Sequence, residues 1–60
     1  MTPTAKDVFR VLRYHRGRPF TINLIAGYLS HLERPLLDAA VVELLKAKKI
    51  RQDGESVIAD

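Results

Sequence analysis

The chain has 60 residues, and its 10 lysines and arginines against 7 aspartates and glutamates give a formal net charge of +3. Hydrophobic residues make up 47% of the sequence, which favours one small folded domain over residues 1–60 rather than a disordered chain. A domain of this size buries only about 60% of the surface of its unfolded chain, so its apolar side chains are needed for one core and an enzyme cleft is not expected. The absence of cysteine excludes disulfides and thiolate metal sites.

The sequence predicts neither a membrane span nor a signal peptide. The most apolar stretch, residues 36–45, contains Asp38 and Glu43 and is shorter than the roughly 18 residues that a span requires. Charged residues from Lys6 to Arg13 interrupt any apolar run near the N-terminus. We therefore expect a cytoplasmic protein.

A first helix is predicted to start between residues 3 and 5. Thr2 followed by Pro3 has the pattern of an N-cap with proline in the first turn, and Thr4 offers a competing start. Gly17 and Pro19 end the helix, because glycine accepts a left-handed cap and proline cannot continue a helix. The apolar residues at helical spacing are Ala5, Val8, Phe9 and Leu12.

The second and third helices follow closely. Thr21 is the predicted N-cap of the second helix, with Phe20 before it packing on Ile25, and this helix should end around residues 30–31. Pro35 disfavours helical geometry in the residue before it, so the third helix should begin at residues 34–36 and run to the lysines at its end. Its inward stripe is Leu37, Ala40, Val41, Leu44 and Leu45.

The pattern then changes from helical spacing to alternation, which predicts a two-stranded hairpin over residues 50–58. Asp53-Gly54 is a preferred two-residue type I′ turn. This turn would pair Gln52 with Glu55, Arg51 with Ser56, and Ile50 with Val57. We expect the core to include Val8, Leu12, Ile25, Leu29, Leu37, Val41, Leu44 and Ile50.

A family resemblance is carried by residues 21–29, Leu32, residues 37–45, residues 50–51 and the turn at 53–54. With the order of elements, these residues resemble a winged helix-turn-helix domain, which is mainly α, with three helices and a small C-terminal β-hairpin, the wing. The resemblance covers nearly the whole chain, but the subfamily is not identifiable.

Two features depart from the pattern of winged helix domains. Ser30 stands where many such turns have glycine, and the turn between the second and third helices is about one residue longer. The resemblance implies a DNA-binding role, with the third helix in the major groove and the wing on a neighbouring groove or on the backbone. Fold alone does not establish function, so the residues themselves have to support this role.

The outer face of the predicted third helix is poor in side chains that read bases. Base-edge readout needs Arg, Lys, Asn, Gln, Ser or Thr near the start of the helix. Arg34 and Lys46 are suitable, whereas Asp38 and Glu43 would repel phosphate. The apolar residues on this face favour packing against another protein, and these are Leu36, Ala39 and Val42.

The expected function is therefore that of a DNA-binding winged helix, a transcriptional regulator or accessory factor that contacts mainly the phosphates of double-stranded DNA. The candidate DNA-binding residues are Arg10, Arg13, Arg16, Arg18, Arg34, Lys46, Lys49 and Arg51. Cations near the ends of helices also complement the helix dipole, so solvated helix ends are an equal explanation for these residues. Tyr14 among the arginines could stack on a base or simply be half-buried.

The alternative is a winged helix that binds a protein partner or forms a homodimer through Leu36, Ala39 and Val42. The sequence ends at Asp60, two residues after the predicted hairpin, so we expect any dimer to use the existing surfaces of the three helices and the hairpin. His15 and His31 have no ligand-spaced partners, and no phosphate loop or catalytic triad is recognisable. We therefore expect no metal, no cofactor, no small-molecule substrate and no enzyme activity.

Overall fold

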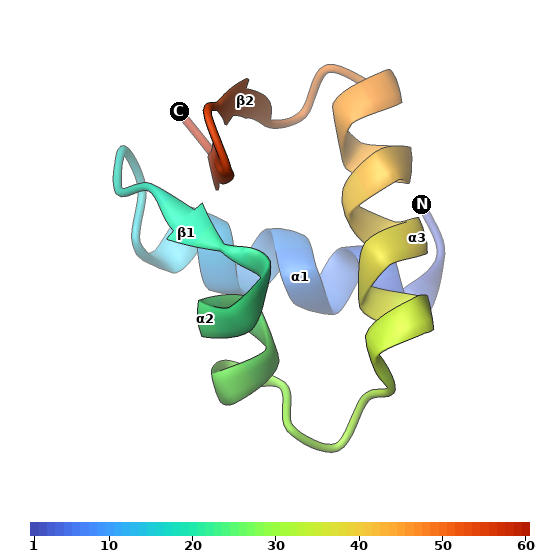
Figure 1. Ribbon diagram of the computed structural model, residues 1–60. Coiled ribbons are helices and arrows are strands. Elements are labelled where there is room, and N and C mark those ends of the chain that lie inside the picture. The colour runs from blue at the N-terminus through green and yellow to red at the C-terminus, as the bar shows by residue number, and fades with distance from the viewer.

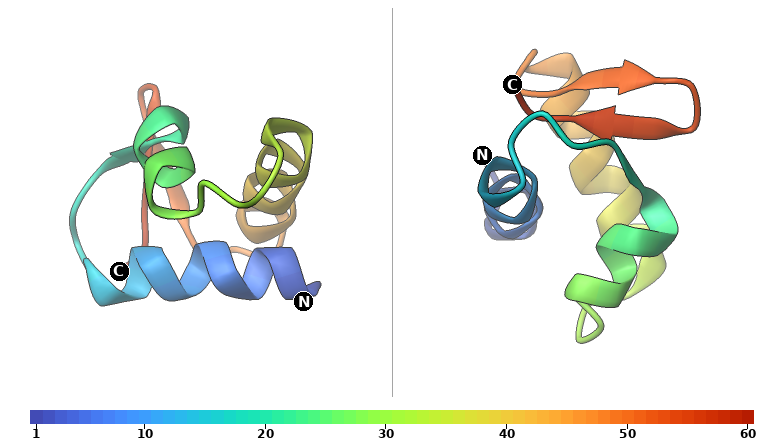
Figure 2. Two further views of the ribbon diagram at one scale, coloured as in Figure 1. Left: turned by 90° about the horizontal axis from the view of Figure 1, so that it is seen from below. Right: turned by 90° about the vertical axis from the view of Figure 1, so that its left-hand side faces the viewer.

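The computed structural model describes all 60 residues as three helices and three short strands. In chain order they are α1 (Pro3–Tyr14), β1 (Phe20–Thr21), α2 (Ile22–Tyr28), α3 (Arg34–Lys46), β2 (Arg51–Asp53) and β3 (Ser56–Ile58). Figure 1 shows the three helices around one centre, and the left view of Figure 2 shows α2 and α3 lying on the same side of α1. The fold is thus mainly α with a small antiparallel sheet, as predicted, and no helix is long and apolar enough to cross a membrane.

The predicted helix starts are confirmed. The Thr2 hydroxyl accepts a hydrogen bond from the backbone N–H of Ala5, and the Thr21 hydroxyl accepts one from the N–H of Leu24, both at 3.2 Å. Each such cap stabilises a helix by about 1 kcal/mol. The second helix is shorter than expected, because it ends at Tyr28 rather than around residues 30–31.

The predicted hairpin register is wrong, because the turn lies one residue later in the chain than predicted. The observed pairs are Asp53–Ser56, Gln52–Val57 and Arg51–Ile58, so the two loop residues are Gly54 and Glu55. Gly54 has a positive φ of 63° and Glu55 does not, which is the pattern of a type II′ turn with glycine first. A type I′ turn at Asp53-Gly54 would have required a positive φ at the aspartate as well, and the observed turn avoids that cost.

The sheet has three strands instead of the predicted two. Phe20 and Thr21 form β1, which pairs antiparallel with β3 through the pairs Phe20–Val57 and Thr21–Ser56. The strand order is β1-β3-β2, so β3 is the central strand. A strand of two residues has no periodicity that a sequence could reveal.

The core is entirely apolar, and every predicted core residue except Val41 is buried. Val41 is only partly buried because it lines a surface groove described below. Six further residues are buried. Helical spacing had placed Ala5 and Ala40 on the inward faces of their helices, and the others, which lie in or beside the sheet, are Phe20, Val57, Ile58 and Ala59.

One polar contact ties the start of α1 to α3. The backbone N–H and the hydroxyl of Thr2 donate to the two carboxylate oxygens of Glu43, each at 3.0 Å. These hydrogen bonds, the backbone one first, hold the pKa of Glu43 below its ordinary value. The Glu43 carboxylate, which was expected on the outer face of the helix, thus accepts hydrogen bonds from the start of α1, and its effect on phosphate stays a prediction.

Candidate functional site

The predicted DNA-binding cations are all exposed, but they do not share one surface. Four lie at or near the carboxyl end of α1, Arg34 begins α3, and the others follow the end of α3 into β2. Figures 1 and 2 show the carboxyl ends of α1 and α3 at different sides of the molecule. The structure thus divides the predicted set into separate groups.

Arg34 and Arg51 are engaged by acidic or polar neighbours. The guanidinium of Arg34 lies 3.7 Å from the carboxylate of Asp38 and donates a hydrogen bond of 3.0 Å to the side-chain oxygen of Asn23. The guanidinium of Arg51 donates to the carboxylate of Asp60 at 2.8 Å, which raises the pKa of Arg51. Exposed pairs of this kind contribute about 0 to 1 kcal/mol, so they do not block phosphate binding, but they lower the local positive charge.

The cations at the end of α1 keep their charge largely unopposed. Arg13, Arg16 and Arg18 form no ion pair, and Arg10 has only a long contact of 3.9 Å with Asp7. The guanidinium of Arg13 lies over the ring of Phe9, 5.7 Å from its centre. We call Arg10, Arg13, Arg16 and Arg18 the basic end of α1.

The segment that carries these arginines is tied to the rest of the fold. Gly17 has a φ of 81°, and its N–H donates to the carbonyl of Ala59 at 2.8 Å. The N–H of Arg18 donates to the carbonyl of His15 at 2.9 Å. Because the backbone is held in place, less conformational entropy is lost when the arginine side chains bind a ligand.

Four aromatic rings meet beside the basic end of α1. The ring of His15 contacts the rings of Tyr14, Phe20 and Tyr28, with centres 5.0, 5.1 and 5.2 Å away. Phe20 is buried, whereas Tyr14 is 85% exposed and Tyr28 is 52% exposed. The cluster therefore presents two tyrosine rings to solvent beside the partly buried His15 and the buried Phe20.

These tyrosines border a shallow hollow of about 530 Å³, which is lined by Arg10, Val11, Tyr14, His15 and Tyr28. We call it the tyrosine hollow. Tyr14 was recognised in the sequence as an aromatic among arginines, but Tyr28 was not. No spacing in the sequence indicates that the end of α2 contacts His15 at the end of α1.

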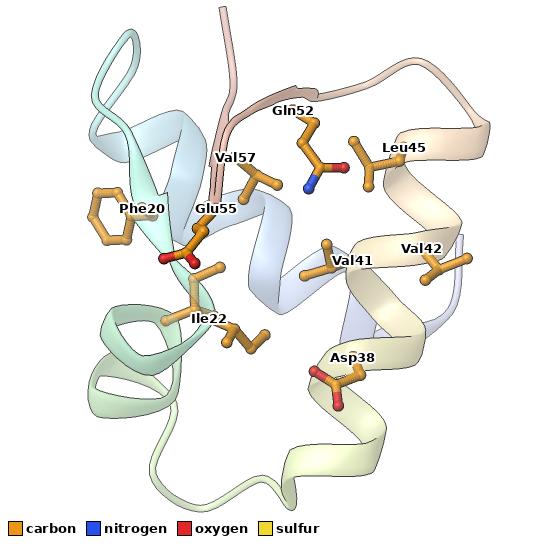
Figure 3. Close-up of a pocket in the computed structure, with 10 residues that line it drawn as sticks. Phe20, Ile22, Asp38, Val41, Val42, Leu45, Gln52, Glu55 and Val57 are labelled. Carbon is orange, nitrogen blue, oxygen red and sulfur yellow. The ribbon is translucent and has the colours of Figure 1, made fainter.

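A second depression, which we call the α3–hairpin groove, lies between α2, α3 and the sheet and has a volume of about 370 Å³. Its lining residues are Phe20, Ile22, Ile25, Asp38, Val41, Val42, Leu45, Gln52, Glu55 and Val57. Figure 3 shows Val41 and Leu45 reaching from α3 toward the strands and Asp38 and Glu55 on opposite sides of the opening. The groove is therefore apolar inside with carboxylates at its rim.

The groove includes only part of the predicted protein interface. Leu36, Ala39 and Val42 are all exposed on α3, and Val42 alone lines the groove. Val41, which was expected in the core, and Leu45, which shares its inward stripe, are both only partly buried. The spacing of apolar residues along the sequence does not show where the sheet stops covering α3.

No cluster of three or more His, Cys, Asp or Glu side chains is arranged to hold a metal ion. All buried side-chain polar atoms have partners, so no unsatisfied polar group points to a missing ligand. Comparison of the chain with models of protein families, with curated proteins and with solved structures found no match.

Proposed function

We propose that this chain is a winged helix-turn-helix domain that binds DNA through phosphate contacts, chiefly at the basic end of α1. The order of three helices and a C-terminal hairpin agrees with the resemblance in the sequence. One observation carries the proposal: Arg13, Arg16 and Arg18 form no ion pair and lie close together on a segment that a backbone hydrogen bond from Gly17 to Ala59 holds in place. Arginines in such a cluster suit phosphates, which they contact without reading sequence. A cytoplasmic location and a regulatory or accessory role stay predictions.

The outer face of α3 supports phosphate binding less well. Arg34 shares its charge with Asp38, and the next exposed residues along this face are apolar. The tip of the hairpin adds the acidic residues Asp53 and Glu55. We therefore expect weak sequence preference, because the helix that would enter the major groove offers few donors for base edges.

The test is the salt dependence of binding to a fluorescently labelled duplex. When binding depends on phosphate contacts, the logarithm of the binding constant falls linearly with the logarithm of the salt concentration. The slope is about −0.9 for each contact. Arg13→Gln, Arg16→Gln and Arg18→Gln should each reduce the slope by about one unit, whereas Arg34→Gln, the matched control, should change it less. Absence of binding at low salt would contradict the proposal, as would a loss of slope confined to Arg34→Gln.

A second candidate function is supported by the α3–hairpin groove. Its apolar interior and the rim carboxylates of Asp38 and Glu55 are complementary to a partner segment that combines apolar with lysine or arginine side chains. Under this alternative, charge reversal in Glu55→Lys should weaken binding of an amphipathic basic peptide, and Val42→Lys should do the same. Retention of a partner by both variants, or self-association of the protein in sedimentation velocity instead, would count against it.

A further inference from the structure

The tyrosine hollow combines two features that a phosphate-binding surface alone does not need. Tyr14 and Tyr28 both contact His15 and both keep at least half of their surface in solvent. Single exposed tyrosines are common on protein surfaces. Here, however, two of them border one hollow together with Arg10, beside a group of arginines that lack ion pairs.

We propose that the tyrosine hollow binds an unpaired nucleobase, which stacks on Tyr14 or Tyr28 while the basic end of α1 contacts the flanking phosphates. This inference rests on the proposed function and narrows its ligand to single-stranded or locally unpaired nucleic acid. In a duplex, both faces of each base are covered by neighbouring pairs, so the rings can stack only on a base that has left the helix. Stacking accepts any base, which agrees with the expected lack of sequence preference.

The arrangement of the hollow favours stacking over a purely electrostatic contact. The ring centre of His15 lies 5.0 Å from that of Tyr14 and 5.2 Å from that of Tyr28, edge-on in both pairs, and half or more of each tyrosine is exposed and available for stacking. Arg10 lines the same hollow and provides a cation beside the rings. A phosphate could approach these groups, but it would leave the aromatic surface exposed.

The chain itself contains the reporter for the experiment. Its 2 tyrosines are Tyr14 and Tyr28, and it has no tryptophan, so its intrinsic fluorescence comes from this hollow alone. We would titrate the protein with an oligothymidine of about 15 nucleotides and with a duplex of about the same length, at one salt concentration. Inorganic polyphosphate serves as a polyanion without bases, and free tyrosine corrects for light absorbed by the nucleic acid.

Oligothymidine should quench the tyrosine fluorescence and bind at least about tenfold more tightly than the duplex, as expected for about one stacked base. Polyphosphate should bind without comparable quenching. Tyr14→Ala should lower the ratio of single-strand to duplex affinity by about tenfold, whereas Tyr14→Phe should keep it because phenylalanine also stacks. Leu24→Ala is the control, since Leu24 is an exposed apolar residue of α2 outside the hollow.

The outcomes separate this inference from the proposed function. Equal affinity for the two oligonucleotides, or an affinity ratio that does not respond to Tyr14→Ala, would overturn base stacking and leave phosphate binding intact. Failure of both oligonucleotides to bind at low salt would overturn the proposed function, and the inference with it. Circular dichroism of each variant distinguishes loss of the contact from loss of the fold.

Discussion

The tyrosine hollow and the α3–hairpin groove are both partly apolar depressions on one small domain, yet their borders have opposite charge. Arg10 lines the hollow, and three further arginines lie close to it in the chain, whereas Asp38 and Glu55 line the groove. The right view of Figure 2 shows the tip of the hairpin pointing away from α1. The charge at the border therefore determines which kind of partner each region can accept.

The difference shows why the net charge of +3 is a poor guide to the location of a binding site. The arginines of α3 and β2, Arg34 and Arg51, are paired with Asp38 and Asp60, although Lys46 and Lys49 form no ion pair. At the end of α1, Arg13, Arg16 and Arg18 are all without an ion pair and lie close together in the chain. A polyanion is accordingly expected at α1, although the family resemblance would place it at α3 and the hairpin.

The largest effect is expected from a core substitution that destabilises the fold on which both the tyrosine hollow and the α3–hairpin groove depend. Leu44 is fully buried in the core where α3 packs on α1, so Leu44→Ala should destabilise the protein by about 2 to 5 kcal/mol. Val42→Ala, on the exposed side of the same helix, should cost much less. Thermal denaturation followed by circular dichroism measures both, and an unchanged melting curve for Leu44→Ala would show that the inward face of α3 is wrongly assigned.

A substitution in the hairpin turn should have a smaller effect, which alters the α3–hairpin groove and leaves the tyrosine hollow unchanged. Gly54 has a positive φ and open space where a Cβ would be added, so Gly54→Val is strained by the backbone alone, at a cost of about 1 to 3 kcal/mol. We expect faster amide exchange in β2 and β3 and unchanged quenching of Tyr14 and Tyr28 by oligothymidine. Unaltered exchange over residues 51–58 would contradict the type II′ turn.

The contact between Glu43 and Thr2 should produce the smallest effect, which is present at neutral pH and disappears in acid. Because folding lowers the pKa of Glu43, the stability from this contact is complete above the ordinary carboxyl pKa and is lost as the pH falls through the lowered value. Glu43→Gln should therefore reduce stability at neutral pH and flatten the loss of stability between neutral and acidic pH. Parallel pH profiles for the variant and the parent protein would exclude this linkage.

Local signals in the sequence were sufficient for the helices. Thr2, Thr21 and the proline at position 35 act on the few residues next to them, so the three helix starts were predicted without tertiary information. Spacing also identified most of the core. The position of the hairpin turn was missed because Asp53-Gly54 and Gly54-Glu55 both satisfy a two-residue turn, and pairing of β3 with β1 is not visible locally.

The candidate sites depended on contacts between distant segments and were predicted less well. The arginines near the end of α1 were identified as candidates, but that Arg13, Arg16 and Arg18 form no ion pair depends on where the acidic side chains lie in the folded chain. Tyr28 lies 13 residues after His15 and meets it because α2 packs beside the end of α1. The groove arises where the sheet leaves Val41 and Leu45 uncovered.

We propose that nucleic acid binds at the basic end of α1 and not at α3 and the hairpin. The most direct measurement is a titration of the isotopically labelled protein with duplex DNA, followed through its backbone amide resonances. We expect the largest shifts over residues 10–18, with little change over residues 34–42 and 53–55. Shifts that centre on Arg34, Ala39 and the hairpin tip would contradict the account and place the DNA on α3.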